Sequence, residues 1–265
     1  MKDITLGQYF PGNSVIHRLD PRTKLIGMLV YITVVFLVKR MALFLVPALF
    51  VVAVAYLARI PASYLVRSLK PIRFLLVLMF FINLFMMRTG NILVEWKFIR
   101  ITDQGVYQAV YICLRLILLL GGTSLMTLTT TPIALTDALE KLLSPLRRFG
   151  FPAHELAMMM TIALRFIPTL IEEADKITKA QMARGADFES GNIIKRAKSM
   201  VPILVPLFIS AFRRADELAM AMESRCYHGG DGRTRMHVLR FAARDGVAAA
   251  ILLAMTGAII ALQAI

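Results

Sequence analysis

Long apolar segments separated by basic ones dominate this sequence. Five apolar runs are present, at Leu25–Val38, Met41–Ala58, Phe74–Met87, Val106–Thr129 and Gly246–Ile265. A helix needs about 20 apolar residues to cross the hydrocarbon core of a bilayer. The first and third runs are shorter, so their basic flanks, which are Arg22, Lys24 and Lys39 for the first run, would have to reach toward the interface. The pattern predicts an all-α polytopic membrane protein with about five transmembrane helices.

Basic residues near the spans predict the orientation of the chain, because short cytoplasmic loops carry an excess of Lys and Arg. The N-terminal segment and the second connection between spans are the richest in them: Lys2, Arg18, Arg22 and Lys24, and Arg59, Arg67, Lys70 and Arg73. The other two short connections have fewer basic residues or mix them with acidic ones. The N-terminus is therefore expected in the cytoplasm and the C-terminus, after five spans, outside.

Charge is distributed unevenly along the chain. Hydrophobic residues make up 58% of it and charged residues 18%, and Lys+Arg 31 against Asp+Glu 17 give a net charge of +14. The apolar runs exclude a soluble nucleic-acid-binding domain despite this charge. The segment Pro132–Asp245 holds 17 of the basic and 13 of the acidic residues. The expected domains are a cytoplasmic N-terminal segment 1–24, transmembrane helices 1–4 in 25–131, a cytoplasmic helical domain 132–245 and a last transmembrane helix 246–265.

The charged segment is expected to form three helices. Thr136 is predicted to cap a helix over Asp137–Phe149, because threonine is a common residue before a first helical turn. A glycine and a proline separate this helix from the next one, which is predicted over about Ala153–Ala183. A third helix is predicted over about Ile193–Ser224. Proline inside a helix removes a backbone donor, so the third helix is expected to bend at the two prolines that it contains, Pro202 and Pro206.

The two long predicted helices share a repeat with an offset of 41 residues. Asp175 precedes Arg184 by nine residues, and Asp216 precedes Arg225 by the same number. Each arginine ends its helix between small or short residues, which are Ala183 and Gly185, and Ser224 and Cys226. The arginines could simply stabilise the negative ends of the helix dipoles, by about 0.3–1 kcal/mol each. Alternatively, two similar helix ends could bind two similar receptors.

The first half of each long helix is apolar. Leu156–Ile171 and Met200–Phe212 are short for spans, and both are interrupted by proline. We expect them to lie along the membrane face, against the spans or a membrane partner, although insertion of both would leave the topology unchanged. Flexible methionines suit a surface that repacks against different partners, but ordinary core methionines would give the same composition. The candidate contact residues are Met158, Met159, Met160, Leu204 and Leu207.

The sequence contains no pattern typical of catalysis, metal binding or nucleotide binding. It has no P-loop motif, and its four histidines lack a helical partner for a metal ion. Cys113 and Cys226 are too far apart for a redox or zinc motif. Arg115 is the one charge well inside a predicted span, and pairing within the protein is favoured over substrate binding. The other predicted spans contain no carboxylate, which disfavours a proton-coupled transporter or a cation channel.

Three motifs together resemble the T component of energy-coupling factor (ECF) transporters. The first is His17–Leu25, and the second is Thr129–Glu140. The third is a pair of X-Arg-X motifs, Ala183-Arg184-Gly185 and Ser224-Arg225-Cys226. Each motif alone is weak, but the combination is specific and covers nearly the whole chain. Cys226-Tyr227 is closer to the shared vitamin-type T component than to the dedicated cobalt/nickel type, which commonly has glycine there.

The resemblance implies a non-catalytic scaffold in the bacterial cell membrane, for uptake of vitamins or other micronutrients. The implied partners are two cytoplasmic ABC ATPases that form a heterodimer, one of several substrate-binding S components, and the lipid bilayer, with no nucleic acid. ATP and Mg would be bound by the ATPases, and this chain would hold no cofactor. Residues 132–245 would be a coupling domain whose arginine motifs dock in ATPase grooves. The alternative is a permease subunit of a dedicated cobalt/nickel importer or of a conventional ABC importer.

Overall fold

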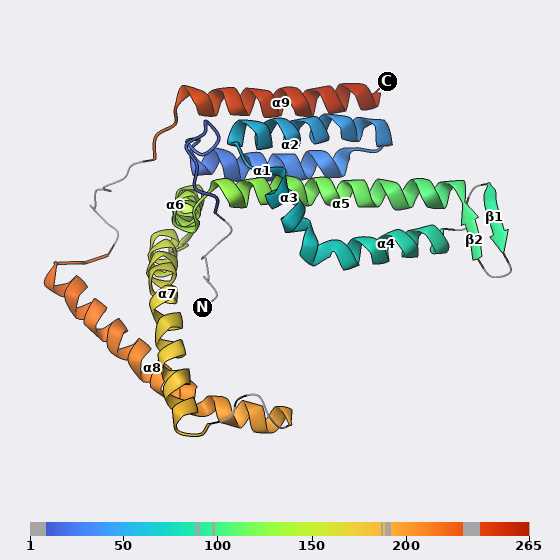
Figure 1. Cartoon of the computed structure of the whole chain (residues 1–265). Coiled ribbons are helices and arrows are strands. Elements are labelled where there is room, and N and C mark those ends of the chain that lie inside the picture. The colour runs from blue at the N-terminus through green and yellow to red at the C-terminus, as the bar shows by residue number, and fades with distance from the viewer. Residues whose placement is uncertain are drawn as a thin grey trace. The chain divides into compact units, whose positions relative to one another are not determined.

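The computed structural model of the chain describes residues 9–87, 89, 91–96, 99–186, 188, 192–229 and 239–264. They form two compact units (Figure 1). The bundle unit contains the described residues of 7–138 and 238–265, and the crossed-helix unit contains those of 139–237. Residues 1–8 of the predicted N-terminal segment and Ile265 of the last predicted span lie outside the described residues.

The bundle unit is built around its longest helix, α5 (Asp103–Thr129). The helices α1, α2, α3 and α4 all contact α5, and α9 packs on α1 and α2 (Figure 1). Buried aliphatic and tyrosine side chains fill the space between them. The bounds of the other helices are α1 Pro21–Leu37, α2 Leu45–Ala58 after a short 3₁₀ helix Met41–Phe44, α3 Ala62–Leu69, α4 Arg73–Met86 after a 3₁₀ turn Lys70–Ile72, and α9 Ala243–Ala264.

Five helical segments among the described residues are long and apolar enough to cross a membrane: Met41–Ala58, Ala62–Met86, Asp103–Thr129, Ala153–Ala183 and Ala243–Gln263. Four of them contain predicted runs, and the second is longer than its run because α3 and a 3₁₀ turn precede α4. The first predicted run forms α1, which at 17 residues is shorter than these five segments. Ala153–Ala183 is instead the helix that we predicted to lie along the membrane face. The multi-span character of the chain is confirmed, and the placement of this helix stays a prediction.

A two-stranded antiparallel hairpin lies between α4 and α5. The strand β1 (Ile92–Trp96) pairs with β2 (Ile99–Thr102). No strand was predicted there, although the segment is rich in β-branched residues, which favour strands. Runs of five and four residues are inconspicuous beside apolar runs of membrane length. Outside the hairpin, the regular structure of the described residues is helical, as predicted.

The helices α1 and α5 approach each other closely at Gly122. A Cβ atom added to Gly122 would lie 2.2 Å from Cε1 of Tyr31. The Tyr31 side chain is buried, and its hydroxyl donates a hydrogen bond to the carbonyl oxygen of Leu118, 2.9 Å away. The absent side chain of Gly122 therefore makes room for an aromatic ring held in place by a hydrogen bond. Gly121 is not crowded, because its added Cβ would meet only Val51, at 3.5 Å.

Gly122→Ala is expected to destabilise the bundle unit by about 1–3 kcal/mol, because the added methyl group displaces the ring of Tyr31 or strains its hydrogen bond. Gly121→Ala is the matched control and is expected to change the free energy of unfolding by less than about 0.5 kcal/mol. Thermal unfolding of both variants in detergent micelles measures the difference. Equal melting temperatures would contradict the close contact assigned to Gly122.

The crossed-helix unit consists mainly of α7 (Ala153–Ala183) and α8 (Ile193–Ser224), whose bounds agree with the predicted ranges. The two helices contact each other and cross (Figure 1). The helix α8 is bent in Figure 1, and Pro202 and Pro206 lie inside it. Each proline lacks the backbone donor of a helical residue and crowds the preceding turn, which accounts for a bend in a long helix.

The predicted helix start at Thr136 is wrong. The helix α6 spans Pro132–Leu143, and a 3₁₀ helix over Ser144–Phe149 follows it. Thr136 lies inside α6, whereas Thr131 occupies the capping position and its Oγ accepts a hydrogen bond from the Ala134 N–H at 3.3 Å. Proline in the first turn has no N–H that needs a partner. Thr131 followed by proline is therefore the stronger start signal.

Candidate docking site

The helix α7 ends in a Schellman motif at Arg184. The N–H of Gly185 donates to the carbonyl oxygen of Met182 and the N–H of Ala186 donates to that of Gln181, each at 3.0 Å. Gly185 has a φ of 85°, in the left-handed region that reverses the chain at such helix ends. Arg184 is the last residue before this reversal. The backbone therefore ends the helix directly after the predicted docking arginine.

The helix α8 ends in the same motif 41 residues later. The N–H of Cys226 donates to the carbonyl oxygen of Glu223 at 2.8 Å, and that of Tyr227 donates to Met222 at 3.0 Å. Cys226 adopts the left-handed conformation, with a φ of 58°, at the position equivalent to Gly185. Since donors and acceptors correspond one to one with those of α7, the sequence repeat is also a structural repeat. The two arginines have the same backbone surroundings.

Both arginine motifs are accessible at the surface of the described structure. All six of their residues are exposed: Ala183, Arg184, Gly185, Ser224, Arg225 and Cys226. Neither guanidinium group forms a hydrogen bond or an ion pair with another described residue. A guanidinium group has five donors in a planar fork. Each helix end therefore offers a set of donors to a partner, and docking itself stays a prediction.

Gly185→Ala is expected to fray the end of α7, because a left-handed conformation costs a residue with a Cβ atom about 1–2 kcal/mol. The amide hydrogens of Gly185 and Ala186 should then exchange about 5- to 30-fold faster in a hydrogen-exchange experiment. Cys226→Ser exchanges one non-glycine residue for another at the equivalent position of α8 and serves as the control. Unchanged exchange at the end of α7 in Gly185→Ala would contradict the Schellman assignment.

A polar contact among Glu173, Ser210 and Arg214 joins α7 and α8 where they cross. The guanidinium group of Arg214 lies 3.0 Å from Oε2 of Glu173, and the hydroxyl of Ser210 donates to the other carboxylate oxygen. The hydrogen bond from Ser210 and the charge of Arg214 together lower the pKa of the Glu173 carboxyl. The pair is partly shielded, since the side chains of Glu173 and Arg214 are 24% and 38% exposed. No sequence prediction included this contact.

The predicted membrane or S-component contact residues are divided between exposed and half-buried positions. Met159, Met160 and Leu204 are exposed, and Met158 and Leu207 are half-buried. Large exposed apolar side chains mark surfaces that contact lipid or another protein. The first halves of α7 and α8 therefore provide an apolar surface, and its partner stays a prediction.

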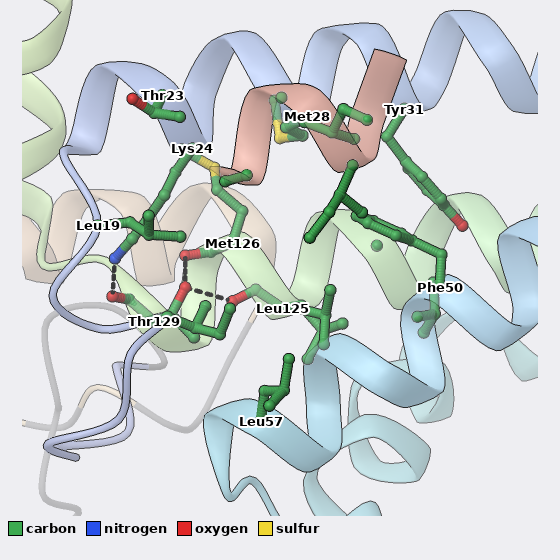
Figure 2. Close-up of a pocket in the computed structure, with 18 of the residues that line it drawn as sticks. Leu19, Thr23, Lys24, Met28, Tyr31, Phe50, Leu57, Leu125, Met126 and Thr129 are labelled. Atoms are coloured by element: carbon green, nitrogen blue, oxygen red, sulfur yellow. Dashed lines mark hydrogen bonds between the residues drawn. The ribbon is translucent and has the colours of Figure 1, made fainter. Parts of the chain in front are cut away.

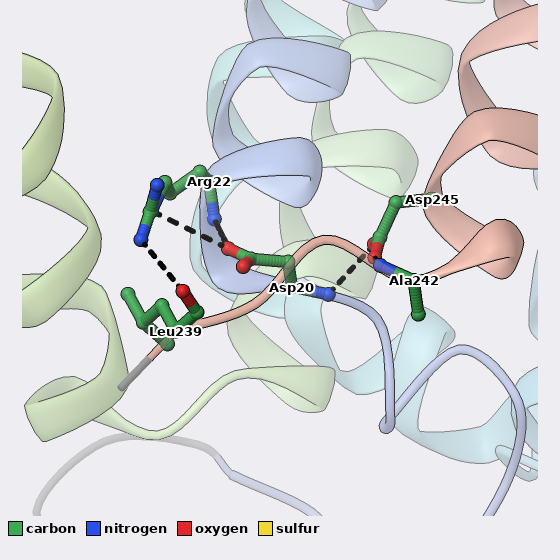
Figure 3. Close-up of polar contacts among 5 residues, drawn as sticks. All are labelled: Asp20, Arg22, Leu239, Ala242 and Asp245. Atoms are coloured by element: carbon green, nitrogen blue, oxygen red, sulfur yellow. Dashed lines mark hydrogen bonds and ion pairs between the residues drawn. The ribbon is translucent and has the colours of Figure 1, made fainter. Parts of the chain in front are cut away.

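The motif His17–Leu25 caps and ties helix ends of the bundle unit. The carboxylate of Asp20 accepts a hydrogen bond from the N–H of Arg22 and so caps α1. The N–H of Asp20 in turn donates to the carboxylate of Asp245, at 2.8 Å (Figure 3). Asp245 is buried at the start of α9, and it also accepts from the N–H of Ala242 at 2.8 Å. A single carboxylate thus joins the beginnings of α1 and α9.

Arg22 and Lys24 also bind within the bundle unit. The guanidinium group of Arg22 donates to the carbonyl oxygen of Leu239, 3.3 Å away. Nζ of Lys24 donates to the carbonyl oxygens of Thr129 at 2.8 Å and His17 at 3.2 Å. We expected both side chains to reach toward the membrane interface. Instead, they satisfy carbonyl oxygens at chain ends that lack helical partners.

An apolar cavity of about 230 Å³ lies among α1, α2, α5 and α9 (Figure 2). Its walls include Met28 and Phe50, and Lys24 lies near Thr129 at one end. The amine of Lys24 and the hydroxyl of Tyr31 both donate to backbone carbonyl oxygens. A polar substrate needs convergent polar groups that are free to bind it, so this cavity does not fit such a site.

Arg115 is paired within the protein, as the sequence analysis favoured. Its guanidinium group donates to the carbonyl oxygen of Val38 at 2.9 Å and to the hydroxyl of Tyr111. It also lies 4.7 Å from the ring centre of Tyr111. Val38 follows the last residue of α1, so Arg115 satisfies a carbonyl oxygen at a helix end inside the bundle unit.

Comparisons with known proteins agree with these features. Residues 12–238 match the CbiQ family of cobalt transport proteins. Three curated relatives carry the name energy-coupling factor transporter transmembrane protein EcfT. The chain is 59% identical to the one from Thermosediminibacter oceani over 245 residues, 92% of both chains. It is 57% identical to that of Acidaminococcus fermentans over 255 residues, 96% of this chain and 95% of the relative, and 48% identical to that of Bacillus subtilis over 245 residues, 92% of both.

A family match over most of the chain and identities near or above 50% over more than nine-tenths of it leave the membership plain. The chain belongs to the EcfT transmembrane components of energy-coupling factor transporters, within the CbiQ family.

Proposed function

We propose that this chain is the coupling scaffold that joins two cytoplasmic ABC ATPases to a substrate-binding S component. The observation that carries the proposal is the pair of equivalent helix ends, each of which exposes an arginine in the same Schellman motif. Two matching ends suit two related ATPase subunits that form a heterodimer. One arginine motif would enter a groove of each subunit, where carboxylate and carbonyl oxygens accept its hydrogen bonds.

Helix-dipole stabilisation explains these arginines less completely than docking does. A cation at a helix C-terminus contributes about 0.3–1 kcal/mol, and it requires neither small neighbours nor open space. At α7 the guanidinium group has both, since Ala183 and Gly185 flank it and a Cβ atom added to Gly185 would meet nothing within 4 Å. An arginine that becomes buried in an interface contributes more, on the order of 2–4 kcal/mol.

The proposed mechanism is mechanical. ATP and Mg bind to the partner ATPases, whose closure moves the docked ends of α7 and α8. The helices transmit this movement to their apolar halves, where Met159, Met160 and Leu204 are exposed for contact with the S component. The S component then tilts or is released and delivers a vitamin or another micronutrient inward. This chain contributes no catalytic residue and holds no cofactor in this scheme.

The proposed topology places the docking ends on the side where ATP is available. The chain is a multi-pass protein of the bacterial cell membrane, with its N-terminus and the coupling domain 132–245 in the cytoplasm. The segments 1–24, 25–131 and 246–265 keep their predicted roles, and the C-terminus lies outside. The distribution of basic residues beside the spans supports this orientation.

Purification of the tagged chain from its native membrane tests the proposed function. Two different ATPase chains and one of several small membrane proteins should co-purify with it. A single dedicated set of partners that imports cobalt or nickel would support the alternative permease role, as would a conventional importer with an external binding protein. Absence of any ATPase from a folded, purified sample would contradict both.

A further inference from the structure

The residues that pair at the helix crossing occupy equivalent positions of the repeat. Glu173 and Arg214 are 41 residues apart, which is also the offset between Arg184 and Arg225. When equivalent residues of two related elements contact each other, the contact lies at the approximate two-fold axis that relates them. The ion pair between Glu173 and Arg214 therefore marks the centre of the pair of helices.

This centre is equally far from both docking arginines. Arg184 lies 11 residues after Glu173, and Arg225 lies 11 residues after Arg214. At the rise of an α-helix the two arms are each about 16 Å long. Beyond the crossing the two helix ends point apart (Figure 1). A change of about 10° in the crossing angle would move the two arginines about 2–3 Å relative to each other.

The other side chains near the centre are less able to define one crossing point. Leu170 and Ile177 lie on α7 one turn to either side of Glu173, and Ala211 and Leu218 lie about one turn to either side of Arg214. All four are half-buried and apolar. Apolar contacts are not directional, so they tolerate slippage between neighbouring turns. An ion pair and a hydrogen bond to one carboxylate have a single geometry.

We propose that Glu173, Ser210 and Arg214 form a crossing lock, which fixes the point where α7 pivots on α8 and keeps the docking arginines at equal distances from it. The lock makes the crossing angle the quantity through which movement of the ATPases reaches the apolar halves. This inference rests on the proposed docking function. A partly exposed ion pair contributes little to stability, so the lock acts on geometry and its variants should fold.

Transport by the intact complex tests the lock. Glu173→Gln and Arg214→Gln are each expected to lower substrate uptake per ATP hydrolysed by about three- to tenfold, while ATPase co-purification stays unchanged. The exchange variant Glu173→Arg with Arg214→Glu should restore the ratio. Arg213→Gln is the matched control, because Arg213 is exposed beside Arg214 on α8. Uptake per ATP equal to that of the control in both single variants would overturn the lock.

Distances between the two arms provide a structural readout. Spin labels at Ala180→Cys and Ala221→Cys occupy exposed, equivalent positions of the repeat, in a chain that also carries Cys113→Ala and Cys226→Ser. Measured in the complex, the distance distribution should be narrow with the lock intact, broad in Glu173→Gln and narrow again in the exchange variant. Identical distributions in all three would overturn the lock. The docking function would still stand if Arg184→Glu and Arg225→Glu release the ATPases, so the two failures are distinguishable.

Discussion

Replacing both Arg184 and Arg225 by glutamate is expected to abolish co-purification of the ATPases and ATP-driven uptake. Each replacement removes the five donors of a guanidinium group and places a carboxylate where the partner groove presents acceptors. Both arginines are exposed and have no partner among the described residues. The double variant should therefore be inserted and folded normally, and its loss of function would come from lost docking.

The single variants are expected to be graded. Loss of one interface anchor of about 2–4 kcal/mol weakens binding by about 30- to 1,000-fold. Because each arginine faces a different ATPase in this account, Arg184→Glu and Arg225→Glu should each weaken the retention of one subunit more than that of the other. Quantitative immunoblots of both ATPases after affinity purification measure this difference.

Two control variants separate docking from a general effect of charge. Lys179→Glu on α7 and Arg213→Glu on α8 make the same charge change at exposed positions away from the helix ends. Both controls should retain the ATPases and uptake. Retention of both ATPases by the double arginine variant, or their loss from the controls as well, would count against docking through the two helix ends.

Asp245→Ala is expected to destabilise the bundle unit by about 2–4 kcal/mol. The carboxylate is buried and accepts hydrogen bonds from the N–H groups of Asp20 and Ala242, which lose their acceptor in the variant. The start of α1 and the start of α9 would no longer be joined at this point. Thermal unfolding in detergent should show a melting temperature lower by about 4–16 °C.

Asp245→Asn and an exposed aspartate refine this prediction. The amide has one acceptor oxygen, so one N–H keeps a partner while the other faces an NH₂ group, and an intermediate loss of about 1–2 kcal/mol is expected. Asp103→Asn is the control, since Asp103 is exposed in the first turn of α5. A melting temperature of Asp245→Ala equal to that of Asp103→Asn would refute the role assigned to this carboxylate.

The ends of the long helices could be predicted because local signals determine them. Small residues and a change of backbone conformation end α7 and α8, and the predicted ranges Ala153–Ala183 and Ile193–Ser224 agree with the structure. The start of α6 was misjudged at Thr136, since the threonine followed by Pro132 is a second local signal five residues earlier. The hairpin escaped prediction because its strands are short.

Contacts between distant segments were not predictable in the same way. Asp20 and Asp245 are 225 residues apart, and nothing in the local pattern of either one indicates the other. The lock residues Glu173 and Arg214 did carry a signal, because they are oppositely charged residues related by the offset of the arginine motifs. The repeat was first recognised from identical residues, and a complementary pair at the same offset is not identical.

Photo-crosslinking of the assembled complex tests the central claim most directly. A photoreactive amino acid placed at Met182 or at Glu223 lies at equivalent, exposed positions two residues before Arg184 and Arg225. On illumination, the account predicts that the first position crosslinks to one ATPase and the second to the other. Crosslinks from both positions to the same subunit, or to lipid and the S component alone, would contradict it.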